Sequence, residues 1–162
     1  MPPVLIIRDA EESDREALKA ICRISFDRLY AYYASYSLDS SNNVLLGEME
    51  GMVVGFAKLI LIRIHDRPLG NILWLAVHPK FRRRGIASAL IEASADYFRS
   101  HGISDIYVST RGDNTPALEL FQGKGFNKVE FRRLMEIHGH KVIEFYFKTH
   151  VSPGEIVLMK TI

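Results

Sequence analysis

The chain has 162 residues, of which 48% are hydrophobic and 25% charged, and both fractions are ordinary for a soluble globular protein. This length predicts a single domain over residues 1–162 with a substantial buried core. The 21 basic and 19 acidic residues leave a formal charge of +2, which argues against a nucleic-acid-binding protein and against a protein held on a membrane surface.

The single cysteine, Cys22, excludes an internal disulfide and suits a reducing compartment. It shares a predicted helix face with Leu18, Ile21 and Phe26, which favours packing over a reactive thiol. The N-terminus lacks a basic region followed by an apolar segment, and no apolar run approaches the roughly 18 residues of a membrane helix. These features predict a cytoplasmic protein.

The N-terminal part predicts a strand at Val4–Ile7 followed by a helix. Residues 13–16 have the form of a capping box, with Ser13 as N-cap and Glu16 reaching back, and apolar residues then recur at helical spacing up to Phe26. The pattern breaks over residues 27–43 into an aromatic stretch with tyrosines at positions 30, 32, 33 and 36. One interpretation of this stretch is a helix packed on the core with its hydroxyls in solvent.

Two further strands are predicted at Val44–Glu50 and Met52–Ile64, joined by a tight hairpin at Glu50-Gly51. Gly55 marks a bulge or a close approach of two backbones. Residues 65–70 predict a turn that leads into the next strand.

Residues 71–101 predict a strand, a basic turn and a helix. Ile72–Val77 is an apolar run that stops at His78-Pro79, Arg82–Arg84 and Gly85 follow, and a helical period then runs up to Gly102. Such a turn is an anion site, because the first N–H groups of the helix have no internal partner and the helix dipole favours negative charge there. Gly85 has no side chain to hold a phosphate away, and Ala87 and Ser88 are small. The alternative is an ordinary strand–helix connection with a solvated basic turn.

The C-terminal part predicts a strand at Ile103–Thr110 and a short helix at Leu118–Lys124, with Thr115 as N-cap and Pro116 at the first helical position. Residues 126–137 and 141–149 alternate in polarity and predict two strands of a hairpin around His138-Gly139. The histidines at 138 and 140 raise the alternative of a metal, but without a third ligand a simple turn is favoured. Residues 155–162 predict a last strand.

Two sequence blocks resemble one known family. Arg82–Ala87 resembles the R/Q-x-x-G-x-G/A pyrophosphate loop of the GNAT superfamily of acetyl-CoA-dependent N-acetyltransferases, and Leu75–Pro79 precedes it in the usual place. The second block is similar to the family's N-x-x-A-x-x-L-[YF]-x-x-x-G-F pattern and consists of Asn114, Ala117, Leu120, Gly125 and Phe126. The resemblance extends from Val4 to Thr149.

The resemblance implies an α/β (α+β) GNAT fold, with a mixed twisted central sheet of about seven strands flanked by helices and splayed between the fourth and fifth strands. Acetyl-CoA is the implied cosubstrate, and no metal is implied. The pantetheine arm would bond the main chain near Leu75–Val77 like an added strand, and the pyrophosphate would lie on the turn. The implied cofactor-binding residues are Leu75, Ala76, Val77, Arg82, Arg83, Arg84, Gly85, Ile86, Ala87, Ser88, Asn114, Ala117, Phe121 and Lys124.

The resemblance also implies acetyl transfer in a ternary complex without a covalent intermediate, with the Val77 main-chain N–H polarising the thioester carbonyl. The family's thiolate-protonating tyrosine is Phe121 here, and two of its base positions are Ser109 and Asn71. No general base is therefore named. The candidates, acting through water, are Glu48, Glu50, His78, Ser109 and the tyrosines near Tyr30.

The acceptor is implied by Phe26–Tyr33, which is similar to the P-E-N-Y-P-Y-Y segment of archaeal protein N-terminal acetyltransferases, with Tyr30, Tyr32 and Tyr33 in register as substrate-binding residues. The segment's glutamate is Arg28, and the tyrosine pair expected after Arg132-Arg133 is Leu134-Met135. A protein or peptide N-terminal α-amino group is the first prediction. A small amine of the polyamine or aminoglycoside type is the alternative, and a non-catalytic CoA-binding module is a third. The protein is expected to be a monomer or homodimer.

Overall fold

The computed structural model describes residues 2–39 and 42–162. Within them, seven strands form one mixed sheet in the order β1-β2-β3-β4-β5-β7-β6, which confirms the predicted fold class. Contacts divide the chain into two compact units that alternate along the sequence, Met1–Leu59 with Trp74–Ser94 and Ile60–Leu73 with Ala95–Ile162. We call them the first and the second unit. The single domain over residues 1–162 stays a prediction.

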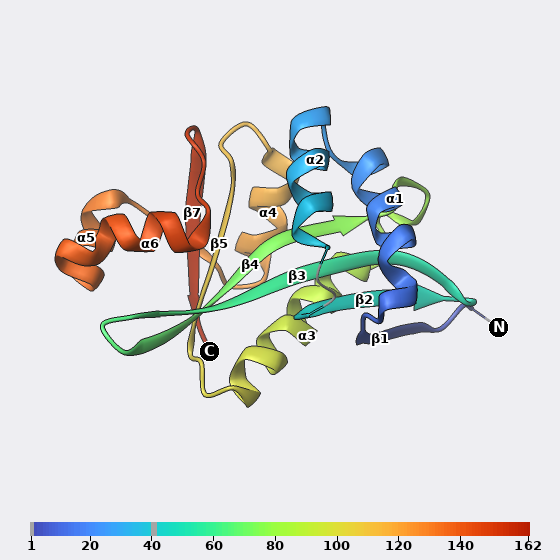
Figure 1. Ribbon diagram of the computed structural model, residues 1–162, viewed down its shortest axis with the longest axis horizontal. Helices are drawn as coiled ribbons and strands as arrows, with labels where there is room; N and C mark the ends of the chain where they lie inside the picture. The colour runs from blue at the N-terminus through green and yellow to red at the C-terminus, as the bar shows by residue number, and fades with distance from the viewer. Residues whose placement is uncertain (1, 40–41) are drawn as a thin grey trace. The chain divides into compact units, whose positions relative to one another are not determined.

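The first unit contains the N-terminal strands and helices (Figure 1). Its elements are β1 (Leu5–Asp9), η1 (Glu12–Asp14), α1 (Arg15–Ser25), α2 (Arg28–Ser37), β2 (Val44–Met49) and η2 (Pro79–Phe81). Three longer elements, β3 (Met52–Ile64), β4 (Arg67–Val77) and α3 (Ile86–Ser100), begin in one unit and end in the other.

Helices α1 and α2 cover one face of the first unit's strands, as Figure 1 shows. Apolar positions three and four residues apart lie on one side of an α-helix, and Leu18, Ile21 and Cys22 are all buried. They pack in one cluster with Leu46 of β2 and Phe56 of β3, which are register partners. Burial raises the pKa of the Cys22 thiol to about 11, so this cysteine is a packing residue.

The predicted position of the capping box is wrong by two residues. The observed capping box lies at Glu11 and Asp14, where the Asp14 carboxylate accepts the Glu11 N–H at 2.8 Å. Arg8 of β1 determines this choice, because its guanidinium binds the same carboxylate at 2.8 and 2.9 Å and holds the pKa of Asp14 below its usual value. Ser13 therefore lies inside η1, and Glu16 is an exposed residue of α1.

Two tight turns connect β2, β3 and β4. Glu50 and Gly51 adopt φ values of +51° and +78°, which confirms the first hairpin. The second turn consists of His65 and Asp66 alone, both with positive φ, so residues 67–70 belong to β4 and the predicted six-residue turn is wrong. The Arg63 guanidinium donates to the Asp66 carbonyl at 3.0 Å and closes this turn.

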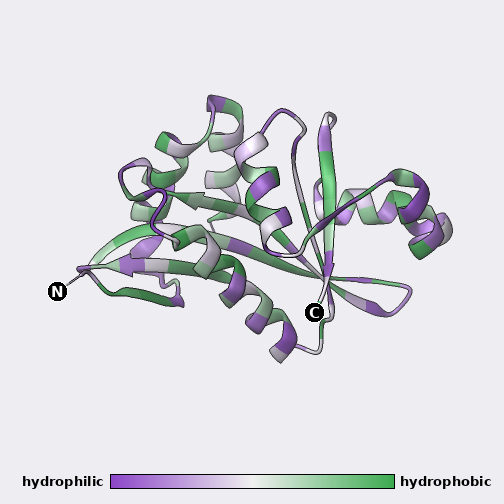
Figure 2. Cartoon of the chain, turned by 180° about the vertical axis from the view of Figure 1, so that it is seen from behind, coloured by the Kyte–Doolittle hydropathy of each residue, from purple (hydrophilic) through white to green (hydrophobic). Residues whose placement is uncertain are grey.

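A pair of glycines brings α3 close to the other face of the first unit. Gly47 and Gly55 are register partners on β2 and β3, and the register shifts directly after Gly47. A Cβ on Gly55 would lie 2.8 Å from the Ala76 carbonyl oxygen and 3.4 Å from Ile86, so the predicted close approach at Gly55 is confirmed, and the register irregularity lies beside it. The glycines leave room for the first turn of α3, whose alternating polar and apolar bands are visible in Figure 2.

The second unit is built on three neighbouring strands. Its elements are β5 (Asp105–Arg111), α4 (Thr115–Gly123), β6 (Asn127–Val129), α5 (Phe131–His138), η3 (Gly139–Lys141), α6 (Val142–Thr149) and β7 (Glu155–Thr161). β7 runs antiparallel between β5 and β6. β5 pairs in parallel with β4 over Gly70–Ile72, and β4 continues to Val77 beyond the last of these pairs.

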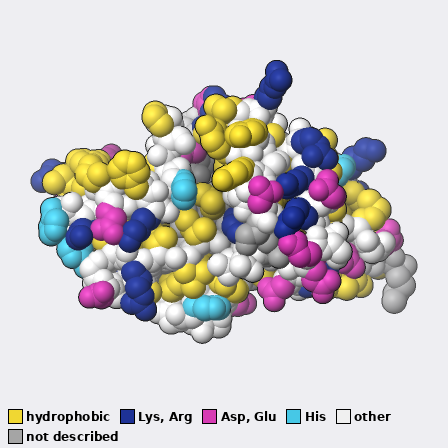
Figure 3. Space-filling model, viewed as in Figure 1, with side chains coloured by type: hydrophobic (Ala, Val, Ile, Leu, Met, Phe, Trp, Pro, Cys, Tyr) yellow, Lys and Arg dark blue, Asp and Glu magenta, His cyan; other side chains and the backbone are white. Residues whose placement is uncertain are grey.

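The predicted hairpin at residues 126–149 is wrong, because the chain forms two helices there. Leu134 and His138 are buried four residues apart on α5, and Val142, Phe145 and Thr149 are buried three and four apart on α6. This spacing packs both helices on the second unit's core, which contains Tyr107 and Val157. Their outer face carries exposed apolar residues, visible in Figure 3 as yellow atoms over α5 and α6.

In residues 2–39 and 42–162, no helix combines the length and the apolar character that crossing a bilayer requires. The same residues hold no group of three or more His, Cys, Asp or Glu side chains placed to bind a metal ion. His138 is 3% exposed and its Nε2 lies 3.2 Å from the Tyr107 hydroxyl, so it is a core residue.

Candidate functional site

The end of β4 presents main-chain groups on the side away from β3. The His78 N–H donates to the Val54 carbonyl of β3 at 2.8 Å, and the Ala76 carbonyl faces Gly55 of β3. Since successive residues of a strand point their N–H and C=O groups to opposite sides, those of Leu75 and Val77 point away from β3. The Arg82 Nε donates to the Val77 carbonyl at 3.2 Å from that side.

The turn between β4 and α3 has the geometry of an anion site. Arg83 and Gly85 both adopt positive φ, +60° and +78°, and the Ala89 N–H makes a helical bond to the Gly85 carbonyl at 3.0 Å. The N–H groups of residues 86–88 precede this bond and have no acceptor within the helix. A Cβ on Gly85 would meet no atom within 4 Å, so the space in front of the turn is open.

The three arginines of the turn are exposed, and two of them also stabilise it. Arg82 bonds the end of β4, and the Arg84 guanidinium lies 5.2 Å from the centre of the Phe81 ring, a cation–π contact. The helix N-terminus and the arginines place partial and full positive charges at one turn. The residues present therefore fit a pyrophosphate.

An aromatic cluster lies on the face of β4 covered by α1 and α2. The Trp74 ring centroid is 5.2 Å from that of Phe26, at the end of α1, and 5.6 Å from that of Tyr30 on α2. All three side chains are partly exposed. Trp74 was not among the predicted site residues, although a single tryptophan directly before the Leu75–Val77 segment is a signal that was present in the sequence.

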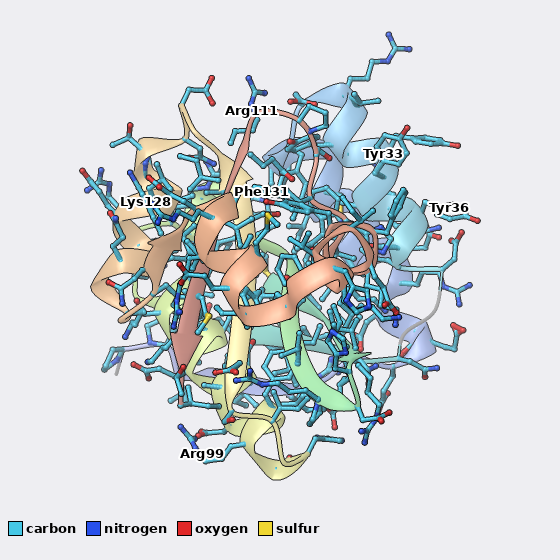
Figure 4. The ribbon with its side chains drawn as sticks, turned by 90° about the vertical axis from the view of Figure 1, so that its left-hand side faces the viewer. Tyr33, Tyr36, Arg99, Arg111, Lys128 and Phe131 are labelled. Atoms are coloured by element: carbon cyan, nitrogen blue, oxygen red, sulfur yellow. The ribbon has the colours of Figure 1, made fainter. Side chains whose placement is uncertain are left out.

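The other tyrosines of α2 point outward. Tyr32 and Tyr33 are 66% and 54% exposed and meet edge to face at 5.5 Å, and Figure 4 shows Tyr33 and Tyr36 projecting from the helix. Asp27 caps α2 by accepting the Tyr30 N–H at 3.0 Å. The helix interpretation of this stretch is therefore correct, and of the three predicted substrate-binding tyrosines only Tyr30 lies against β4.

The second sequence block forms α4 in the second unit. Asn114 is the N-cap and its side chain accepts the Ala117 N–H at 3.3 Å, so the prediction of Thr115 as N-cap is wrong by one residue. Phe121 is 4% exposed and packs edge to face on Phe126 at 5.3 Å. Lys124 is the C-cap residue.

Three candidate bases belong to the first unit, and each has a structural environment that limits this role. The Glu48 carboxylate accepts the Arg8 guanidinium at 2.9 and 3.0 Å. Glu50 is exposed at the β2–β3 turn. The His78 Nδ1 accepts the Lys80 N–H at 3.1 Å, so this nitrogen is occupied as a cap.

The second unit contains Ser109, a further candidate. The Ser109 hydroxyl donates to the Glu155 carboxylate at 3.3 Å, across paired strands β5 and β7. Asn71, at the other family base position, is 2% exposed and donates its side-chain N–H to the Thr149 carbonyl at 3.2 Å.

A strand end with outward main-chain groups, a basic glycine turn and a helix N-terminus together form a site that can bind a phosphate-bearing ligand. The sequence profile of the acetyltransferase (GNAT) family matches residues 7–126, and the chain belongs to this family of N-acetyltransferases. Both units contribute to the matched segment.

Proteins similar in sequence include N-terminal acetyltransferases. An N-alpha-acetyltransferase of Sulfurisphaera tokodaii is 28% identical over 141 residues, which cover 78% of this chain and 83% of that protein. One of Saccharolobus solfataricus is 27% identical, over 76% and 81% of the two chains. The [ribosomal protein bS18]-alanine N-acetyltransferase of Escherichia coli is 32% identical over 51% and 53%.

Solved structures show the same fold at low sequence identity. A chain of the NatC complex bound to Gag peptide and CoA superposes with a TM-score of 0.73 at 19% identity, over 98% of each chain. Naa50 of Arabidopsis thaliana, in complex with a bisubstrate analogue, gives 0.71 at 17% identity over 98% and 99%. The PaiA N-acetyltransferase of Thermoplasma acidophilum with coenzyme A gives 0.70 at 13% identity over 98% and 99%.

Proposed function

We propose that this protein transfers the acetyl group of acetyl-CoA to the N-terminal α-amino group of a protein or peptide, by direct attack in a ternary complex. The main support for this proposal is one strand–turn–helix segment. Main-chain groups at the end of its strand β4 point away from β3, and its turn has the geometry of an anion site. The names of the archaeal relatives support the acceptor class, and so does the Gag peptide bound to the NatC complex. Cytoplasmic location and a monomeric or homodimeric state stay predictions.

The donor would be held by groups of two kinds. Amide groups of a pantetheine arm pair with outward main-chain groups near Leu75 in the manner of an added strand, which leaves the Val77 N–H for the thioester carbonyl. The pyrophosphate would accept hydrogen bonds from the N–H groups of residues 86–88 and would be attracted by the positive charges of the turn. The positions Asn114, Ala117, Phe121 and Lys124 stay predictions as cofactor-binding residues.

Bound acetyl-CoA supplies an activated acyl group whose leaving group is a thiolate. The chain's own part is to place the Val77 N–H against the thioester carbonyl, where a hydrogen bond strengthens as negative charge develops on the oxygen. Alignment of amine and carbonyl supplies a further share of the acceleration. We expect the amine proton to leave through water, since Glu48, His78 and Ser109 make structural hydrogen bonds and Glu50 lies exposed at a turn.

The donor site is tested by replacing Gly85 with glutamate, which adds a negative charge and a Cβ at a positive φ. Gly51 is a matched control, because it has the same φ of +78° and equally open surroundings but lies in the β2–β3 turn. We expect Gly85→Glu to weaken acetyl-CoA binding at least tenfold in calorimetry and Gly51→Glu to leave it within twofold. Equal affinities in both variants would show that the pyrophosphate lies elsewhere.

A further inference from the structure

We propose that the outer face of α5 and α6 binds the same face of a second copy of this chain, so that the protein forms a twofold homodimer. The face, which we call the α5–α6 face, consists of Phe131, Met135, Ile143 and Phe147. All four residues belong to the second unit. The dimer goes beyond the proposed acetyl transfer and does not depend on it.

Two short antiparallel helices form the α5–α6 face. Phe131, at the start of α5, stacks on Tyr146, near the end of α6, with ring centroids 6.1 Å apart and an interplanar angle of 23°. The exposed apolar residues lie four apart on each helix, at 131 and 135 on α5 and at 143 and 147 on α6. Residues four apart share one side of a helix, so each helix presents one apolar pair. Other sides of both helices pack on the second unit's core, which holds the face in place.

The α5–α6 face leaves a substantial apolar area in water. Its four side chains are between 46% and 78% exposed, and Phe147 is the most exposed of them. At roughly 150–250 Å² for a complete large side chain, they expose about 400–500 Å² of apolar surface. An apolar patch of about 300–600 Å² on a monomer is often functional. Two such faces packed together with their polar rims remove about 1,200 Å² from water, which is the lower bound of a specific interface.

Helix α6 is complementary to itself across a twofold axis. When two copies of α6 pack antiparallel about the level of Phe145, Phe147 of each copy lies opposite Ile143 of the other. Glu144 and Lys148 lie on one flank of the same helix, where Lys148 bonds Glu144 at 2.6 Å. The antiparallel packing brings Lys148 of each copy to within about 3 Å, measured along the helix axis, of Glu144 of the other copy. Opposite charges therefore meet at the rim of the apolar contact.

The charges at the rim fit a second copy better than an anionic membrane. Glu136 accepts Arg133 at 3.0 Å, and Glu144 accepts both Lys141 and Lys148, so the rim contains both signs. A membrane surface would bring these carboxylates against anionic headgroups, whereas membrane-bound helices have a strongly basic polar face. In the dimer, a carboxylate with several acceptor sites can bind cations of both copies. Twofold dimers are also the commonest oligomers of soluble proteins.

Sedimentation equilibrium of the whole chain over about 1–200 µM tests the dimer. We expect a monomer–dimer equilibrium in the parent protein, and we expect Ile143→Asp to weaken it at least tenfold, because the variant buries a charge at the contact. Ile24→Asp is the matched control, since Ile24 is 51% exposed on α1 and Ile143 is 58% exposed on α6. The control should keep the dissociation constant within about twofold of the parent value. Circular dichroism checks that both variants fold.

The charged rim provides a second test. Lys148→Glu and Glu144→Lys each place like charges across the twofold axis, so each variant alone should associate at least about fivefold more weakly than the parent. An equimolar mixture of the two variants restores opposite charges in a heterodimer and should associate within about twofold of the parent. The mixture also controls for the bond from Lys148 to the Arg63 carbonyl, which Lys148→Glu lacks both alone and in the mixture.

A parent protein that stays monomeric over the whole range would overturn the proposal, and so would a dimer that Ile143→Asp leaves intact. A variant mixture that associates no better than either variant alone would also overturn it, because the twofold packing of α6 requires the rescue. Binding of the parent monomer to vesicles of phosphatidylserine and phosphatidylcholine, lost in Ile143→Asp, would assign the face to a membrane instead. Acetyl transfer is measured separately, so failure of the dimer leaves the proposed function standing.

Discussion

At the scale of single residues, Phe121 stands where the resemblance implies a thiolate-protonating tyrosine, and its ring is part of the core. Its ring is almost fully buried against Phe126, where a tyrosine hydroxyl would need a hydrogen-bond partner. Thiols such as that of cysteine have an ordinary pKa of about 8.5, so a thiolate is a tolerable leaving group near neutral pH and a nearby acid is dispensable.

We therefore expect Phe121→Tyr to change kcat by less than about tenfold at saturating acetyl-CoA, although general acid catalysis typically contributes about 10²- to 10⁴-fold. The variant should also lose about 1–3 kcal/mol of unfolding free energy, measured by urea titration, because its hydroxyl is desolvated. A hundredfold rise in kcat would show that the missing phenol limits the reaction.

His138 makes the stability of the second unit depend on pH. Burial lowers its pKa below the ordinary 6.5, because the neutral ring stacks on Phe145 at 4.8 Å and contacts the Tyr107 hydroxyl. A group whose folded pKa is depressed binds its proton more readily in the unfolded chain. The stability that it contributes is thus present above pH 6.5 and is lost as pH falls from there toward the folded pKa.

We expect the free energy of unfolding to fall between pH 7.5 and 5, with a slope from this residue of at most about 1.4 kcal/mol per pH unit. His138→Gln keeps a polar side chain but cannot titrate, and it should flatten the curve relative to the parent protein. Urea unfolding at several pH values measures the difference. Parallel curves for the two proteins would contradict the assignment.

At the scale of elements, the position of β4 depends on the absence of a side chain at Gly55. The Ala76 carbonyl oxygen would lie 2.8 Å from a Cβ at this position, and backbone atoms cannot move aside as a flexible side chain can. The same strand carries Leu75 and Val77, so a displacement here reaches the proposed donor site.

Gly55→Ala is therefore expected to cost about 1–3 kcal/mol of unfolding free energy and to weaken acetyl-CoA binding several-fold. Gly123→Ala is the control, because a Cβ at that helical position meets no atom within 4 Å, and its effect should stay within about 0.5 kcal/mol. The two measurements are urea unfolding and calorimetric titration with acetyl-CoA. Equal effects of the two substitutions would show that the close approach is unimportant.

The elements that could be predicted from the sequence are those whose signals are local. The strand, turn and helix of residues 71–101 were found because the arginine run, Gly85 and the helical period lie within one short segment. Helices α5 and α6 were missed because each has only eight residues, and apolar residues at so short a range fit both a strand and a helix period. Packing against Tyr107 of β5, which is distant in sequence, decides between a strand and a helix at these residues.

At the scale of the whole molecule, the family and the sheet could be predicted, while the aromatic cluster around Trp74 could not. Two motif blocks in the right order are enough to indicate the GNAT fold. The contacts of Trp74 with Phe26 and Tyr30 join segments far apart in sequence, so no local pattern contains them. The same is true of the hydrogen bonds that occupy Glu48 and Ser109, which the sequence offered as candidate bases.

The central claim is that the protein acetylates the α-amino group of an N-terminus. The most direct measurement incubates the protein and acetyl-CoA with an equimolar mixture of a polyamine and a peptide that has a free α-amine, a methionine first residue and one internal lysine. Fragmentation mass spectrometry then locates the acetyl group. We predict that it lies on the α-amine, in amounts at least tenfold above the lysine and the polyamine and dependent on the protein. Acetylation confined to the polyamine, or none above the protein-free background, would contradict the account.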